Sequence, residues 1–269
     1  MNKKIILQYI SDIHLEIRSG TPNIKKLAEN LVLLGDIGDP LSKKYKRFIS
    51  ECSKNHKNVF LLYGNHEYYN NDIKYNANSA ITMGEKNKYF NNCPYNVYNL
   101  NNKVYYLNDN NDIFYEPIAN CVKLIGTTLW SDISNDTVNY LNDYRKIYKS
   151  EKTLLTPEDT RTFFKINKSF ILDELKKEQD IPTVILTHHG VNDLCNGKYI
   201  NSTNKSGFTT NIPELSNFNN VIACINGHTH SNINATVPDT NIKLLSNCMG
   251  YPGEPDVGYN PEALLTIDI

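Results

Sequence analysis

The sequence predicts an α/β fold whose strands are buried on both faces of a sheet. Short runs of aliphatic and β-branched residues, without polar alternation, recur along the 269-residue chain. Each run ends in Gly, Asp, Asn, His or a similar polar residue, and stretches of helical character separate several of them. Runs of this kind are typical of strands that helices cover on both sides. With 40% hydrophobic residues, the chain can build a packed core.

Six runs predict the strands of this fold together with the polar segments that follow them. In each of them the polar residues gather at one end. They are "IILQYISDIH" (5–14), "LVLLGDIGD" (31–39), "VFLLYGNHE" (59–67), "VKLIGTTLW" (122–130), "TVILTHHG" (183–190) and "VIACINGHTH" (221–230).

Three stretches predict helices, at residues 42–55, 72–90 and 156–179. The third has the clearest start, with Thr156 as N-cap and Pro157 in the first helical position. Apolar residues then recur at helical spacing and predict a core-facing stripe of Phe163, Ile166, Phe170 and Ile171.

Two stretches do not follow the strand and helix alternation. Residues 91–115 alternate Tyr and Val with Asn-rich turns, which predicts short antiparallel strands or a hairpin. Residues 190–217 predict a long loop directly after a polar strand end, where binding residues are often found. No repeat or linker divides the sequence, so we expect a single domain over residues 1–269.

Composition narrows the classes of partner and compartment. The 28 basic and 29 acidic residues are spread along the chain and give a net charge of −1, so an extended nucleic-acid partner is not indicated. No apolar run approaches the roughly 20 residues of a membrane helix, and the N-terminal run is too short for a signal peptide. The six cysteines form no CxxC motif, which favours reduced thiols and a cytoplasmic location.

The polar residues at the strand ends form the main functional signal. Six of the seven histidines fall in these segments, and only His56 lies outside them. The set comprises Asp12, His14, Asp36, Asp39, Asn65, His66, Glu67, His188, His189, His228 and His230.

The spacing of these residues suits a metal site. In an extended segment, side chains at positions i and i+2 share a face, so Asp12 and His14, or His228 and His230, can point into one volume. The carboxyl ends of parallel strands meet in a common crevice. Oxygen and imidazole donors without thiolates suit Mn, Fe, Zn or Co, and the donors exceed what one ion needs. Two ions that share one carboxylate would use all of these donors. This arrangement is known in sites that hydrolyse phosphate esters.

The order D-x-H, G-D, G-N-H-E, strand-end H and G-H-x-H resembles the calcineurin-like metallophosphoesterases. These motifs run from Ser11 to His230 and cover most of the chain. The resemblance implies a four-layer sandwich of two mixed β-sheets flanked by helices, with the metal site at the C-terminal ends of the strands.

The resemblance also implies a role for each matching residue. Asp12, His14 and His230 would bind one divalent ion, Asn65, His188 and His228 would bind the other, and Asp36 would bridge them. Asp36 and His66 would be the catalytic residues, with His66 beside the phosphate as anion stabiliser or leaving-group acid. Two ions, Mn, Fe or Zn, would activate a shared water as hydroxide for attack on phosphorus.

The expected activity is hydrolysis of a small phosphorylated substrate, with nucleotides among the candidates. The single-domain form with the GNHE motif resembles cyclic-nucleotide and related diesterases, which favours a phosphodiester. A phosphomonoesterase acting on nucleotide, sugar or protein phosphates stays open. So does an inactive protein-binding scaffold of the same fold.

Several neighbours of the motifs receive other predictions. His189 is expected to pack rather than coordinate, Asp39 and Glu67 to cap or orient, and His56 to be solvated. Trp130 could belong to the core or wall the pocket. The tail residues Asn247, Tyr251 and Glu254 are expected to be structural, and the 190–217 loop could bring Tyr199, Lys205 or Asn211 to the substrate.

Overall fold

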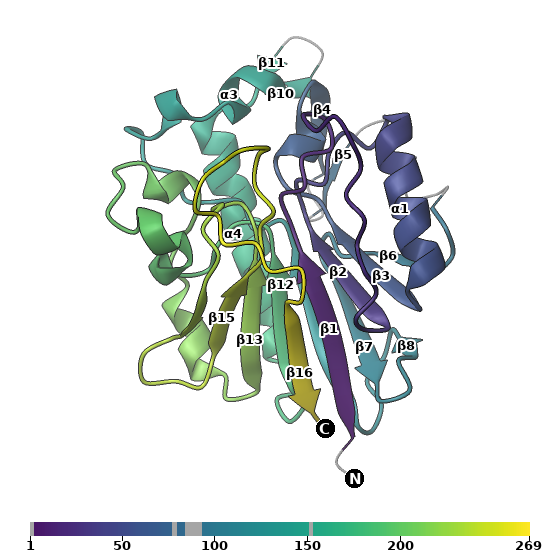
Figure 1. Cartoon of the computed structure of the whole chain (residues 1–269). Helices are drawn as coiled ribbons and strands as arrows, with labels where there is room; N and C mark the ends of the chain where they lie inside the picture. Colours follow the sequence, from purple (N-terminus) through teal and green to yellow (C-terminus); the bar gives the residue numbers. More distant parts are fainter. Residues whose placement is uncertain (1–2, 77–79, 84–92, 151–152) are drawn as a thin grey trace.

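A computed structural model describes residues 3–76, 80–83, 93–150 and 153–269, and contains two large mixed β-sheets (Figure 1). The first sheet has five strands, of which four run parallel and one edge strand runs antiparallel. In spatial order the strands are β16 (Leu264–Asp268), β1 (Lys4–Ile10), β2 (Asn30–Leu34), β3 (Asn58–Leu62) and β6 (Val97–Asn99).

The second sheet has seven strands with a parallel centre and antiparallel edges. All six predicted strands are present, but three belong to each sheet. The order is β14 (Asn234–Thr236), β15 (Lys243–Ser246), β13 (Val221–Asn226), β12 (Thr183–Thr187), β9 (Cys121–Thr127), β7 (Lys103–Asn108) and β8 (Ile113–Phe114).

Alternation along each strand builds two separate cores. In β2, Val32 and Leu34 join an apolar cluster with residues of the second sheet, whereas Leu31 and Leu33 join the cluster that contains the helices. The same division occurs in β3, β9 and β12, because successive side chains point to opposite faces. The sheets therefore pack face to face, and α1 (Lys43–Asn55) and α4 (Pro157–Leu175) cover their outer faces, as the four-layer prediction requires.

The structure confirms the predicted start of helix α4 and most of its predicted core-facing stripe. Thr156 and Asp159 form a reciprocal capping box in front of Pro157. Phe163 and Ile171 are buried, whereas Ile166 and Phe170 are half-buried at the edge of the stripe. The remaining short helices are α3 (Asp143–Lys146), η1 (His66–Tyr68), η2 (Val138–Tyr140), η3 (Asp193–Tyr199), η4 (Lys205–Gly207) and η5 (Pro213–Asn217).

The predicted helix at residues 72–90 is wrong in the part that the structure describes. Strands β4 (Asn71–Asn76) and β5 (Ala80–Met83) form an antiparallel pair there, and β4 also pairs with β10 (Ile147–Ser150), which pairs with β11 (Thr153–Leu154). Ladder hydrogen bonds between β4 and the neighbouring β5, and between β4 and the distant β10, outweigh local helix propensity. Residues 77–79 and 84–90 of that prediction lie outside the described residues.

The prediction for residues 91–115 is confirmed in one half. Strands β7 and β8 form an antiparallel hairpin, whereas β6 adds in parallel to β3 in the other sheet.

Trp130 is completely buried in the core, so it does not wall the pocket. No helix in the described ranges has the length and apolar character needed to cross a bilayer.

The prediction that His56 is solvated is wrong. Its residue is 3% exposed, Nδ1 lies 2.9 Å from the carbonyl oxygen of Cys52, and Nε2 lies 3.4 Å from Oε1 of Gln8. His56 follows α1 directly, and its backbone N–H also donates to the Cys52 carbonyl, so the helix end holds the ring inside. Burial lowers the pKa of His56.

We predict that His56 makes the stability of the protein depend on pH below neutrality. Because its folded-state pKa lies below the unfolded value of about 6.5, its contribution is complete above pH 6.5 and is lost as the pH falls toward the folded pKa. The loss cannot exceed about 1.4 kcal/mol per pH unit. Urea unfolding of metal-free protein at pH 7.5 and 5.5 should show a larger drop for wild type than for His56→Gln. Equal drops would contradict this assignment.

Candidate metal centre

The predicted site residues meet where the ends of strands from both sheets converge. Hydrogen bonds join the strand ends of the two sheets at this point. Nδ1 of His188, after β12, donates to the carbonyl oxygen of Leu34 in β2 at 2.8 Å. The backbone N–H of His228, after β13, donates to the carboxylate of Asp12, after β1, at 3.0 and 3.1 Å. All seven predicted ligands are at most 8% exposed.

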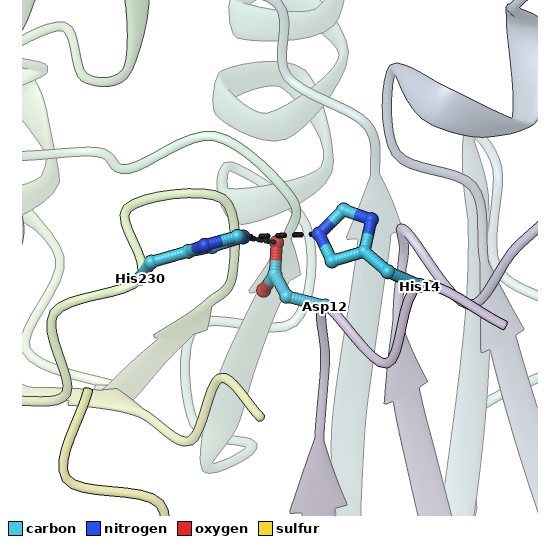
Figure 2. A group of neighbouring side chains, drawn as sticks. All are labelled: Asp12, His14 and His230. Carbon is cyan, nitrogen blue, oxygen red and sulfur yellow. Dashed lines mark hydrogen bonds and ion pairs between the residues drawn. The ribbon is translucent and has the colours of Figure 1, made fainter. Parts of the chain in front are cut away.

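Asp12, His14 and His230 form one group whose ligand atoms lie within 4.8 Å of one another. Figure 2 shows the two rings directed toward each other beside the Asp12 carboxylate. The Nε2 atoms of His14 and His230 are 3.0 Å apart, and Nε2 of His230 is 3.3 Å from Oδ1 of Asp12. Three donor atoms therefore surround one small volume.

Asp36, His188 and His228 form a second group of the same kind. Nε2 of His188 lies 3.4 Å from Oδ1 of Asp36 and 3.1 Å from Oδ1 of Asn65. The other carboxylate oxygen of Asp36, Oδ2, lies 3.9 Å from Nε2 of His14 in the first group. Asp36 thus directs one oxygen toward each group, and His228 and His230 belong to different groups.

The second group brings acceptors together without a proton between them. Nδ1 of His188 carries the proton because it donates to a carbonyl oxygen, so Nε2 presents a lone pair. Burial and the charge of His228 lower the pKa of His188 to about 3, which keeps the ring neutral at pH 7. Asn65 donates through Nδ2 to Asp143 and so turns its oxygen toward His188. A lone pair and two oxygens converge, which is the environment that a cation requires.

The first group has the same outward-facing protons. Nδ1 of His14 donates to Glu16 at 3.1 Å, and Nδ1 of His230 donates to Glu254 at 2.6 Å. Burial lowers the pKa of His230, but hydrogen bonding and the charges of Asp12 and Glu254 outweigh it and raise that pKa to about 9. A proton on Nε2 of His230 therefore satisfies this group in metal-free protein, and a divalent cation would displace it.

The charge of the site also suits cations. Burial, together with the negative charges of Glu67 and Asp12, raises the pKa of Asp36 well above its ordinary value. A buried carboxylate beside other carboxylates is unfavourable unless a positive charge compensates it. Two divalent ions fit this donor set, which combines carboxylate, amide and imidazole groups without thiolates.

The side chains converge for a different reason from the one predicted. Extended alternation does not apply, because β1 ends at Ile10 and β13 ends at Asn226. The motif residues instead adopt left-handed backbone conformations, which cost about 1–3 kcal/mol each for residues other than glycine. Five of the seven predicted ligands have positive φ angles, namely Asp12 (54°), His14 (51°), Asp36 (52°), His228 (68°) and His230 (46°).

Glu67 orients the site, as predicted, and does so through the backbone. Its fully buried carboxylate accepts hydrogen bonds from the N–H groups of four residues at 2.7 to 3.2 Å, namely Asp36, Ile37, Gly38 and Gly64. Burial raises its pKa to about 7, and the amide hydrogen bonds oppose that shift. Asp39 caps the N–H of Leu41 at 3.1 Å.

His189 packs beside the site, as predicted. It is buried against Trp130 and His228, with ring centroids 5.5 and 4.2 Å away. Asn247 is also structural, since it accepts from the N–H of Asn260 and donates to the carbonyl oxygen of Tyr9.

Tyr251 and Glu254 belong to the site, contrary to the structural role predicted for them. The ring of Tyr251 lies 4.4 Å from that of His14, and Glu254 holds His230. Glu16, Asp143 and Tyr69 contact predicted site residues too. Glu16 stands two residues after His14 in "SDIHLE", a spacing that could have suggested it, whereas no local pattern marks Asp143.

A pocket of about 360 Å³ opens over the two groups. The 190–217 segment forms one wall and contributes Tyr199 and Lys205, as the loop prediction allowed. Asn211 does not line the pocket, and its Oδ1 accepts a hydrogen bond from the backbone N–H of Asp193 at 2.7 Å. The lining includes Asp36, Asn65, His66, His228 and His230, together with Tyr69, Tyr140, Tyr199, Phe208 and Tyr251.

A family model described as calcineurin-like phosphoesterase matches residues 9–232. The chain belongs to the calcineurin-like phosphoesterases. The uncharacterised protein L509 of Acanthamoeba polyphaga mimivirus is 31% identical to this chain, over 98% of this chain and 97% of that protein. The family prediction is therefore confirmed.

Solved structures show the same fold. The phosphopantetheinyl hydrolase PptH of Mycobacterium tuberculosis matches 99% of this chain and 97% of its own chain, with a TM-score of 0.62 and 15% identity. A dimetal phosphatase of Danio rerio matches 98% and 92%, with a TM-score of 0.50 and 14% identity.

Gly64 gives a direct test of the geometry. A Cβ atom there would lie 2.2 Å from Oδ1 of Asp36 and 2.5 Å from Nε2 of His188. We predict that Gly64→Ala displaces both side chains, lowers the free energy of unfolding by about 1–3 kcal/mol and reduces metal content below that of wild type. Thermal unfolding and plasma mass spectrometry of dialysed protein measure both effects.

Gly20→Ala is the matched control, because a Cβ at Gly20 meets nothing within 4 Å. Its metal content and melting temperature should equal those of wild type. A Gly64→Ala protein that behaves like this control would contradict the close approach of β3 to the site.

Proposed function

We propose that the protein is a dinuclear metal-dependent phosphoesterase that favours phosphodiesters. The observation that supports it most is the convergence of imidazole nitrogens and carboxylate oxygens, with the Nδ1 protons of His14, His188 and His230 turned outward to acceptors. Asp12, His14 and His230 would hold one ion, and Asn65, His188 and His228 the other. Asp36, with one oxygen toward each group, would bridge them.

The bound ions, Mn, Fe or Zn, would supply a water of lowered pKa and neutralise charge on the phosphoryl oxygens. The protein supplies the rest. Buried carboxylates and outward hydrogen bonds keep the ligand atoms in place before substrate arrives. His66 lines the pocket, with Nε2 3.7 Å from Oδ2 of Asp36, which suits donation to the leaving oxygen.

The charge of the pocket favours a diester. Of the described residues that line it, Lys205 is the only lysine or arginine, and its Nζ already lies 2.8 Å from Asp193. A diester carries one negative charge and a monoester up to two, so a pocket with little free positive charge beyond the ions suits the diester. The tyrosines and asparagines of the wall suit an uncharged second ester group of a small substrate, such as a nucleoside.

Turnover of model esters tests this proposal. Metal-stripped protein, supplied in turn with Mn, Zn, Fe(II) or Mg, should hydrolyse bis(p-nitrophenyl) phosphate faster than p-nitrophenyl phosphate. A monoester preference would replace the diester assignment. Two bound ions without turnover of either ester would support a scaffold instead.

Asp36→Asn should lower kcat/KM by about 10³-fold or more, because a bridging carboxylate affects both ions and their contribution amounts to several kcal/mol. Asp39→Asn is the matched control, since the amide still offers an oxygen to the N–H of Leu41. Retained metal and activity in Asp36→Asn would contradict the bridging role.

His66→Ala should lower kcat by about 10²–10⁴-fold while both ions stay bound, because His66 acts on the substrate rather than on a metal. Steady-state kinetics and metal analysis of the same preparation measure the two quantities. Metal loss in this variant would assign His66 to the ligand set.

A further inference from the structure

One carboxylate oxygen of Glu16 contacts two imidazoles. Oε1 lies 3.1 Å from Nδ1 of His14 and 2.9 Å from Nδ1 of His66. Because an ionised carboxylate only accepts hydrogen bonds, both rings carry a proton on Nδ1. Glu16 therefore joins a proposed metal ligand to the proposed proton donor through a single atom.

The contact decides which nitrogen of His66 faces the pocket. With Nδ1 turned to Glu16, Nε2 lies 3.4 Å from the hydroxyl of Tyr251 and 3.7 Å from Oδ2 of Asp36. Tyr69 stacks on the ring, with centroids 4.3 Å apart and planes at 30°. Stacking limits the tilt of the ring, and the hydrogen bond limits its rotation and fixes its tautomer.

The surroundings of Glu16 suit this role. Its side chain is 30% exposed and that of His66 is 11% exposed, so the pair lies near the surface rather than in the core. A side chain there can be removed without opening a cavity in the core. The edge-on contact of the His14 and His66 rings, at 4.5 Å, keeps both within reach of the same oxygen.

We propose that Glu16 is a positioning residue that holds Nε2 of His66 toward the leaving-group oxygen. The proposal rests on the proposed function. In this step the ring of His66 carries a proton on both nitrogens, with the Nδ1 proton held by Glu16. As the bond from phosphorus to the attacking water oxygen forms and the bond to the leaving oxygen breaks, the Nε2 proton passes to the leaving oxygen and the ring keeps its Nδ1 proton. The attacking water releases a proton to solvent, and His66 takes one from solvent before the next turnover. Glu16 stays ionised throughout.

This role predicts a dependence on the leaving group. An aryl oxide of low pKa departs without a proton, whereas a poor leaving group needs one. Glu16→Ala should therefore lower kcat by about 10–100-fold for the diester with the poorest leaving group and less for bis(p-nitrophenyl) phosphate. If Glu16 acted only by supporting His14, Glu16→Ala would instead lower the turnover of all the esters equally.

A double-mutant cycle separates the two explanations. Turnover of a series of substituted phenyl diesters is measured for wild type, Glu16→Ala, His66→Ala and the double variant, with metal content determined for each. We expect two ions in every protein and less than a twofold further loss when Glu16→Ala is added to His66→Ala. Glu51→Ala, which removes an exposed partner of Arg47, is the control and should match wild type. Equal losses in both backgrounds, or a loss explained by a missing ion, would overturn the proposal.

The tautomer of His66 provides a readout without turnover. Long-range ¹H–¹⁵N spectra of metal-free protein, with His66→Ala for assignment, should show the proton on Nδ1 in wild type and a shift toward Nε2 in Glu16→Ala. An unchanged tautomer would overturn the proposal. If wild type hydrolyses no ester with any metal, the proposed function fails, while the spectra still test the contact between Glu16 and His66.

Discussion

The geometry of the site depends on the buried carboxylate of Glu67. Its two oxygens accept four backbone N–H groups from the segments that follow β2 and β3. Each of these amides would otherwise be buried without an acceptor, at a cost of about 1–3 kcal/mol. The carboxylate thereby fixes the distance between the loop that carries Asp36 and the turn that carries Asn65 and His66. Gly64 allows this distance, since a Cβ there would occupy the space of the Asp36 carboxylate.

Backbone hydrogen bonds hold the strained residues in a similar way. The N–H groups of Asp12, His14 and Leu15 donate to the carbonyl oxygens of residues 35, 36 and 37 at 2.9 to 3.0 Å, so the first motif runs along the second. Left-handed conformations persist only where the surroundings determine them strongly. Gly227 contributes by its size rather than by turning the chain, because its Cβ would lie 2.7 Å from Oδ2 of Asp12.

The hydrogen bonds around the site orient the side chains of the proposed metal ligands. Glu16, Glu254 and the Leu34 carbonyl each accept an imidazole proton on the side away from the groups' centres. Asp143 does the same for the amide of Asn65. These outer contacts hold the Nδ1 protons away from the interior, so that the inner ring nitrogens can offer lone pairs to a metal, in His230 once a cation has displaced its Nε2 proton. The same acceptor at Glu16 extends this control from His14 to His66, so the ligand set and the pocket are linked at one carboxylate.

The sequence by itself determined the α/β class, the six strands, helices α1 and α4 and the set of polar strand ends. These features depend on local patterns, namely apolar runs, capping residues and motif spacing, which act within a few residues. The tertiary structure decided the division of the strands between two sheets, the strands β4 and β5 where a helix was expected, and the burial of His56. It also decided the left-handed backbone of the motifs and the contacts of Glu16, Tyr251, Glu254 and Asp143. Most of these depend on pairing or packing between segments far apart in the chain, for which local sequence carries no signal. The β4–β5 pair and the contact of Glu16 with His14 are local, but β4 also pairs with β10, and Glu16 also contacts His66.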